Sequence, residues 1–278
     1  MKVADVFMKS HSVEKQWRLY ALECARRVEY ILGDPESTTG AEVLDVTEQH
    51  ISGKATDEEL YEAHAKAEKS VLGISRYIED EILRESDNRI AKTVAEKHEE
   101  LGNDRAKAYA IASTDAEMAE LSSILSAMYT ISLAARFSPD DAEKFAKEVE
   151  NAAAQVFADR VVQEVAWRTA YMAELENPPM YSTRSGNLFF QMVNKSIWDS
   201  GIKDSDGLAP LNPEEWRRTL DAIHSQAVDF ELSLMRKEMN RPESAEDPTA
   251  TAGFVAHLDE EHGNVSSANG IEMTDNIG

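Results

Sequence analysis

The positions of glycine and proline constrain the fold of this chain most. Both residue types are scarce, and they fall mainly between stretches of periodic apolar residues. The 278 residues include 12 glycines and 8 prolines. Both residue types interrupt helices, so Gly33-Asp34-Pro35, Gly53, Gly102 and Asn177-Pro178-Pro179 mark helix ends. Between these points apolar residues recur every three or four positions, the period of one face of an α-helix. We therefore expect an all-α fold, a multi-helix bundle of about six to seven helices.

The first half of the chain predicts three helices. One runs from Val13 to about Ile31, and a shorter one runs from about Gly40 to Ile51. Thr56, followed three residues later by Glu59, forms a capping box that opens the third. This helix can continue through Ile90 and Val94 to Leu101. Its apolar seam alternates steps of four and three residues and is expected to be buried core: Leu60, His64, Ala67, Val71, Ile74, Ile78 and Ile82.

The second half predicts three long helices and a short one. Ser138-Pro139-Asp140-Asp141 opens the second long helix, and Asn212-Pro213-Glu214-Glu215 caps the last. Residues 180–211 are irregular, apart from a short helix from Asn187 to Trp198. The first long helix follows Gly102 and carries a broad apolar face: Met118, Leu121, Leu125, Met128 and Ile131.

The composition changes after residue 240. Residues 241–278 hold eight acidic residues against one arginine, a net charge of -7, and they lack periodic apolar positions. Such a segment cannot support a core. We expect a helical bundle domain over residues 1–240, with a sub-boundary near 177–186 as an alternative, and a disordered acidic tail over 241–278.

Charge and cysteine content narrow the class of protein. Lys and Arg number 29 against 52 Asp and Glu, a net charge of -23, so we expect no direct binding to nucleic acid. We find no unbroken apolar run of membrane-spanning length and no signal-peptide core, so we expect no membrane association. The single cysteine, Cys24, is typical of a reducing compartment. We expect the protein to be cytoplasmic.

One stretch carries a family resemblance. Residues 17–68 read WRLYALECARRVEYILGDPESTTGAEVLDVTEQHISGKATDEELYEAHAKAE. The WRL start, the Cys-Ala-Arg-Arg helix, the DPES turn and the GKATDEEL restart resemble a helical module of uncharacterised bacterial proteins, some of them named as immunity proteins. The resemblance implies a binder that neutralises a toxin by contact and needs no catalytic residues.

Familiar signatures of catalysis and cofactor binding do not occur in the sequence, and we expect no cofactor. One group resembles a metal site, Glu58, Glu62, His64 and Glu68, but Glu62 and His64 are two residues apart and face different directions. We favour a hydrogen-bonded core histidine at His64. The pair Asp221 and His224 is a second candidate for acid-base or metal chemistry, and here too we favour a structural role.

Partner-binding residues are expected where aromatic and polar residues mix in the long connection after residue 180. The candidates are Tyr181, Arg184, Phe189, Phe190 and Trp198. Apolar anchors among adaptable polar groups are over-represented at binding surfaces. The same aromatic residues could instead cover an open end of the bundle, which we consider the safer interpretation.

Three functions remain open. The acid surplus, the resemblance and the candidate binding residues favour a non-catalytic helical protein that binds a protein partner, in the manner of an immunity protein or inhibitor. An acidic decoy that mimics nucleic acid, from a phage or mobile element, is an alternative based on charge alone. A metal or carboxylate enzyme with its site inside the bundle is the third. A homo-oligomer is left open.

Overall fold

Helices make up all the regular secondary structure that the structure describes. The computed structural model describes residues 13–33, 36–136, 141–175 and 188–239. These residues form one compact unit with no strand, which confirms the all-α bundle. The predicted tail, 241–278, and the alternative boundary near 177–186 lie outside the described residues. The eight α-helices are α2 (Val13–Arg26), α3 (Glu36–Ile51), α4 (Asp57–Tyr77), α5 (Ser86–Leu101), α6 (Asn103–Ala135), α7 (Ala142–Glu174), α8 (Leu188–Asp199) and α9 (Pro213–Met239).

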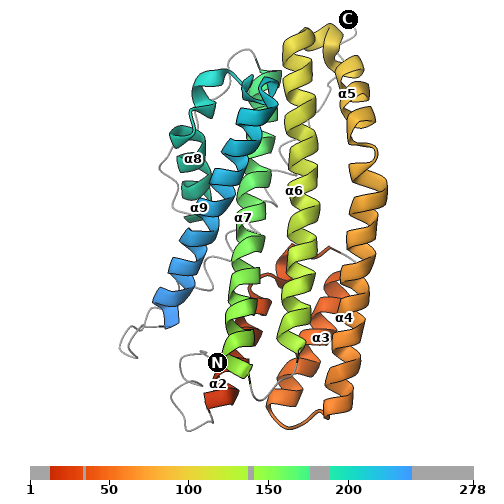
Figure 1. The fold of residues 1–278 in the computed structure, drawn as a ribbon, viewed down its shortest axis with the longest axis vertical. Helices are drawn as coiled ribbons and strands as arrows, with labels where there is room; N and C mark the ends of the chain where they lie inside the picture. Colours follow the sequence, from red (N-terminus) through yellow and green to blue (C-terminus); the bar gives the residue numbers. More distant parts are fainter. Residues whose placement is uncertain (1–12, 34–35, 137–140, 176–187, 240–278) are drawn as a thin grey trace, which may run out of the picture. The chain divides into compact units, whose positions relative to one another are not determined.

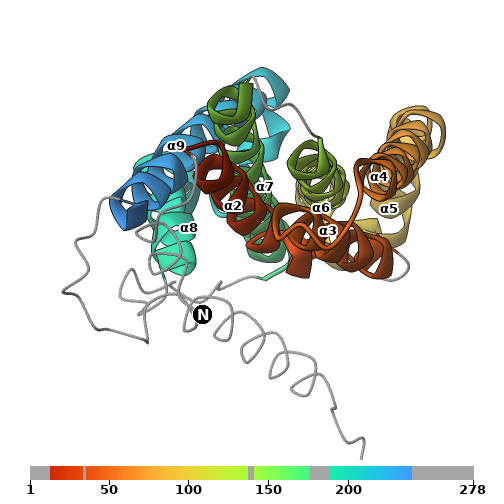
Figure 2. The ribbon, with the colours of Figure 1, turned by 90° about the horizontal axis from the view of Figure 1, so that it is seen from below.

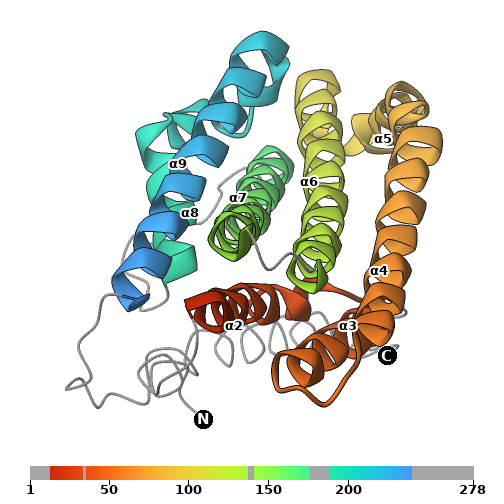
Figure 3. The same cartoon turned by 60° about the horizontal axis from the view of Figure 1, so that its bottom comes forward.

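The helices α6 and α7 form the centre of the bundle. Each has 33 residues, and they lie side by side (Figure 1). Their contact is the most extensive between any two described helices. α4 and α5 lie along the other flank of α6, and α8 and α9 lie beside α7 (Figure 1). α2 and α3 both cover the same side of the central pair (Figure 2, Figure 3).

Small side chains dominate the buried surface of the central pair. Alanine, serine and threonine supply 14 of the 17 buried residues of α6 and nine of the 18 buried residues of α7. Side chains of this size let two helix backbones approach closely, because the distance between helix axes depends on the residues at the contact. Most of the larger apolar residues of α6 therefore lie on other sides of the helix.

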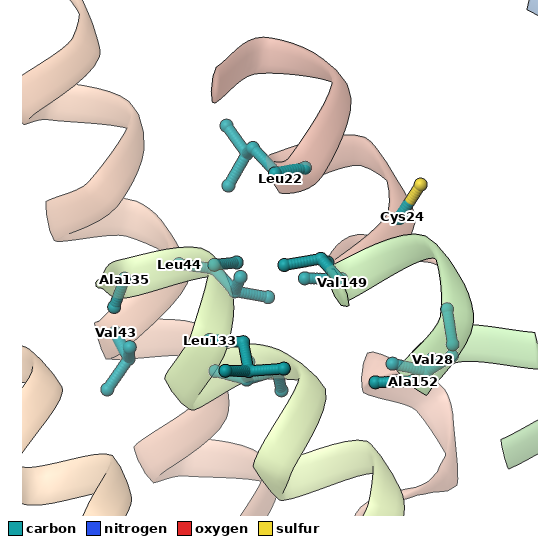
Figure 4. Close-up of a cluster of buried hydrophobic side chains, with 14 of the residues drawn as sticks. Leu22, Cys24, Val28, Val43, Leu44, Leu133, Ala135, Val149 and Ala152 are labelled. Atoms are coloured by element: carbon teal, nitrogen blue, oxygen red, sulfur yellow. The ribbon is translucent and has the colours of Figure 1, made fainter. Parts of the chain in front are cut away.

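The large apolar side chains of the core gather where α2 and α3 meet the central pair (Figure 4). Leu22 and Cys24 of α2 lie with Val149 of α7, and Leu44 of α3 lies with Leu133 of α6 (Figure 4). All five side chains are buried. Burial of a residue of this size contributes about 1.5–3 kcal/mol, so this cluster holds the two N-terminal helices on the central pair.

The capping box is confirmed. Thr56 Oγ1 accepts a hydrogen bond from the Glu59 backbone N–H at 3.2 Å, and Glu59 Oε2 accepts one from the Thr56 N–H at 2.7 Å. α3 begins at Glu36, one turn before the expected Gly40. Gly40 is buried inside α3, where a Cβ atom would lie 2.7 Å from Cδ1 of Leu32 and 3.1 Å from Cδ1 of Ile131. A glycine that looked like a helix start is therefore a point of close packing.

The long helix expected from Thr56 to Leu101 is divided. α4 passes at residue 78 into a π-helical segment, Ile78–Leu83, and α5 follows from Ser86. The division occurs without glycine or proline, so the sequence pattern did not indicate it. Leu60, Ala63 and Ala67 are buried, whereas Val71 and Ile74 are only half-buried. The predicted seam is thus buried core over its first turns only.

Among the described helices, only α6 has the length and apolar composition of a membrane span. More than half of its most apolar 18-residue window, 56%, is buried within the bundle. The core helix of a soluble bundle meets the same criteria of length and composition. The burial of α6 among α7, α4 and α3 accounts for its apolar character.

Enlarging a small buried residue of the central helices should destabilise the fold. Ala166 of α7 is fully buried, so Ala166→Leu should lower the free energy of unfolding by about 1–3 kcal/mol through overpacking. The matched variant Ala91→Leu, on the exposed side of α5, should change it by less than about 0.5 kcal/mol. Urea unfolding measures both. Equal stability of the two variants would contradict close packing through small side chains.

Candidate functional site

The residues predicted to bind a partner divide into two groups. Tyr181 and Arg184 lie outside the described residues. Phe189, Phe190 and Trp198 lie on α8, which begins at Leu188, as expected for the short helix in this connection. The structure therefore locates three of the five side chains.

The three aromatic residues of α8 contact side chains of the bundle. Phe189 is buried edge-to-face against Phe157 of α7, with ring centroids 5.8 Å apart. The Arg168 guanidinium lies over the Phe190 ring, 5.3 Å from its centroid. Lys203 Nζ lies 3.5 Å from the centroid of the Trp198 ring, which remains partly exposed. Phe189 and Phe190 attach α8 to α7, and Trp198 is the aromatic residue of this group that presents most surface to solvent.

A shallow cavity of about 330 Å³ lies between α8 and α9, close to Trp198 in sequence. Its lining is polar around the apolar Ile223 and includes Ser196, Ser200, Arg218 and Thr219. Arg218 donates from Nε to the backbone carbonyl of Glu214 at 3.2 Å. The cavity offers hydroxyl groups, one guanidinium and the carboxylates of Asp199 and Glu215.

The sequence spacing allowed His224 to pair with Asp221. In the structure His224 instead pairs with a buried carboxylate on another helix. His224 Nε2 lies 3.2 Å from Oδ1 of Asp159 on α7. Ser122 and Ser126 of α6 donate to Oδ2 of the same carboxylate at 3.1 and 3.0 Å. We call these four residues the Asp159 cluster. No pattern in the sequence points to Asp159, because its hydrogen-bond partners are 33 to 65 residues away along the chain.

The Asp159 cluster contains serine, histidine and aspartate, but its connectivity is not that of a catalytic triad. In a triad the histidine lies between the serine and the carboxylate and takes the serine proton. Here both serine hydroxyls donate directly to Asp159, and His224 lies at the other oxygen of the same carboxylate, not between a serine and the carboxylate. The geometry instead satisfies a carboxylate that is 8% exposed and ties α6, α7 and α9 together.

A half-buried carboxylate, that of Asp115, joins α9 to α6. Trp216 Nε1 donates to Oδ2 of Asp115 at 2.7 Å. Burial raises the pKa of Asp115, and the hydrogen bond from Trp216 opposes that rise. The interaction anchors the start of α9 against α6, so its role is structural like that of the Asp159 cluster.

His64 has the hydrogen-bonded position that the sequence favoured. Its Nδ1 lies 3.1 Å from the backbone carbonyl oxygen of Ser132, and its Nε2 lies 3.4 Å from Oε1 of Glu68. Glu58 and Glu62 are exposed on α4. In the part of the chain that the structure describes, no group of three or more His, Cys, Asp or Glu side chains could hold a metal ion.

An exposed apolar surface lies where α4 runs beside α6. Tyr61 is 71% exposed, Leu72 is 58% exposed and Tyr129 is 49% exposed. The His64–Ser132 contact fixes the register of the two antiparallel helices. On α4, Tyr61, Glu68 and Leu72 are three before, four after and eight after His64. They therefore extend along the side of α4 on which His64 meets Ser132.

The α6 residues on this surface follow from the same contact. Tyr129 and Leu125 are three and seven residues before Ser132, so they share its side of α6. The side of α6 opposite Tyr129 is covered by α3, because Ile131 of α6 lies next to Gly40 of α3. Tyr129, two residues away and thus about 160° around the helix, points away from α3. We call Tyr61, Glu68, Leu72, Leu125 and Tyr129 the α4–α6 face.

The α4–α6 face continues along α6 through residues of the broad apolar face that the sequence predicted. Met118, Leu121 and Leu125 are only half-buried, whereas Met128 and Ile131 of the same predicted stripe are fully buried. Alanines 112, 116 and 119 are buried in the same part of α6. The predicted apolar face is therefore fully buried only toward its end, while small residues make the close contact with α7.

Comparisons with known proteins add no relative from which a site can be transferred. No family model, no curated protein and no solved structure matches the chain.

Removal of the central carboxylate of the Asp159 cluster should destabilise the bundle. Asp159→Ala leaves two serine hydroxyls and His224 without their shared acceptor, which should cost about 1–3 kcal/mol of the free energy of unfolding. Asp229→Ala, at an exposed position of α9, is the matched control and should stay within about 0.5 kcal/mol of wild type. Chemical denaturation distinguishes them, and an unchanged midpoint for Asp159→Ala would contradict the structural role.

Cys24 should be unreactive in the folded protein. Its side chain is 2% exposed, and burial raises the pKa of the thiol to about 12. At pH 8 only about one thiol in ten thousand is then the reactive thiolate. We expect no alkylation by iodoacetamide at pH 8 on the timescale that modifies the unfolded chain completely. Rapid modification of the native protein would show that α2 opens from the core.

Proposed function

We propose that the protein is a non-catalytic helical protein that binds a protein partner through the α4–α6 face. The observation that carries the proposal is the exposure of Tyr61, Leu72 and Tyr129 on one side of two adjacent helices. Tyrosine and other large apolar side chains supply most of the binding energy at protein interfaces. Contiguous exposed apolar residues with a polar rim are typical of such surfaces.

The polar clusters of the bundle support the same proposal. The carboxylates of Asp159 and Asp115 are engaged in hydrogen bonds that hold helices together. The aromatic residues of α8 contact α7 and Lys203. Each of these groups stabilises the scaffold. Trp167 and Tyr171 of α7 and Leu188 of α8 are also exposed, but less than Tyr61, Leu72 and Tyr129 of the α4–α6 face.

The sequence resemblance indicates how the protein would act on its partner. Residues 17–68, which resemble a module of proteins named as immunity proteins, include the first half of α4 and Tyr61 itself. Under this proposal the chain acts in the cytoplasm as an immunity-like inhibitor that neutralises a toxin by contact. It requires no cofactor, and its partner is a protein, not nucleic acid or a membrane.

Site-specific photo-crosslinking tests the proposal. A benzophenone amino acid replaces Leu72 in one variant and Tyr77 in another, since Tyr77 is 51% exposed on a different side of α4. In the native host we expect a discrete crosslinked protein from position 72 that position 77 does not give. Identical background from both positions would contradict the proposal. A product of two copies of this chain would assign the face to self-association.

A further inference from the structure

We infer that the α4–α6 face accommodates a cationic, amphipathic α-helix of the partner, an inference that rests on the protein-binding function proposed above. Three observations lead to it: the shape of the apolar surface, the charges around it and the cost of placing a second copy there.

The shape of the surface matches a helix laid along the two helices of the face. Tyr61 and Leu72 are 11 residues apart, so they lie on the same side of α4 about 16 Å from each other. The α6 row of Tyr129, Leu125 and Met118 runs parallel to them. A long, narrow apolar strip between two helices fits a partner helix that presents anchors at i, i+4, i+7 and i+11.

The charges around the strip are unequal at its two ends. On α4 the carboxylates one and two turns from Tyr61 are Asp57, Glu58 and Glu68, and all three are exposed. At the adjoining end of α6 one cation, Arg136, is exposed and lies over the Phe145 ring. Beside Leu72, Lys69 and Arg76 accompany carboxylates and make that end mixed. A partner helix therefore gains most when its lysines and arginines pass Tyr61 and its apolar residues contact Leu72 and Leu125.

A second copy of the chain fits this surface poorly. From residue 57 to residue 85 the chain has nine carboxylates and four basic residues, within a protein of net charge -23. A symmetric contact would place the same carboxylates opposite one another, which is unfavourable. A basic partner converts this repulsion into attraction.

The test uses synthetic helical peptides of about 20 residues, long enough to cover the strip. The first has a leucine stripe on a lysine background. The second keeps the stripe but has glutamate in place of lysine. The third has the composition of the first with the leucines scattered around the helix. We expect the intact protein to bind the first peptide at least tenfold more tightly than either control.

Two pairs of variants locate the binding. Tyr61→Ser with Leu72→Ser should weaken binding of the first peptide at least tenfold, whereas Tyr77→Ser should leave it unchanged. Glu58→Gln with Glu68→Gln should weaken binding more than Glu85→Gln with Glu99→Gln, which removes the same two negative charges at other exposed positions. Circular dichroism of each variant confirms that the helices persist.

Three results would overturn the inference. They are equal binding of the scattered-leucine peptide, equal binding by the Tyr61/Leu72 double variant, and no binding of the first peptide at all. If the crosslink from position 72 still identifies a partner, the face binds a protein of other chemistry and the proposed function stands. If that crosslink is also absent, the proposed function fails as well.

Discussion

The close contact between α6 and α7 determines how the rest of the bundle is arranged. Alanine, serine and threonine supply most of the buried positions on α6, and they let the two longest helices approach without large side chains between them. The same contact leaves Met118, Leu121 and Leu125 on another side of α6. A packing requirement at the centre thus produces an apolar surface at the periphery.

The buried polar groups complement this packing. Small side chains bury little apolar area per residue. The helices that pack around the central pair therefore need other interactions to hold them in place. Asp159 joins α9 to both central helices, and Asp115 fixes the start of α9 through Trp216. Each carboxylate receives hydrogen bonds that offset its burial. These interactions make α9 part of the scaffold and leave α4, at the other edge, with exposed tyrosine and leucine.

Local features of the fold could be predicted from sequence, and features that depend on distant contacts could not. The Thr56–Glu59 capping box could be recognised because the two residues are three positions apart. The start of the last helix could be recognised from its cap at Asn212. By contrast, apolar periodicity could not show that Met118 and Leu121 are only half-buried, because it does not reveal that alanine makes the close contact with the neighbouring helix. Asp159 could not be found for a related reason, since its hydrogen-bond partners belong to two other helices. Nor could the π-helical break at Ile78, where glycine and proline are missing from the sequence.

The two methionines of α6 provide the most direct test of this account. Met128 is fully buried, and Met118, ten residues earlier, lies half-buried on the extension of the α4–α6 face. Peroxide oxidation of the native protein, followed by mass spectrometry, measures the accessibility of each sulfur. The account predicts that Met118 is oxidised first and that Met128 stays reduced until the chain unfolds. Equal protection of both residues would show that the face is covered, and oxidation of Met128 as fast as Met118 would contradict the packing of the central pair.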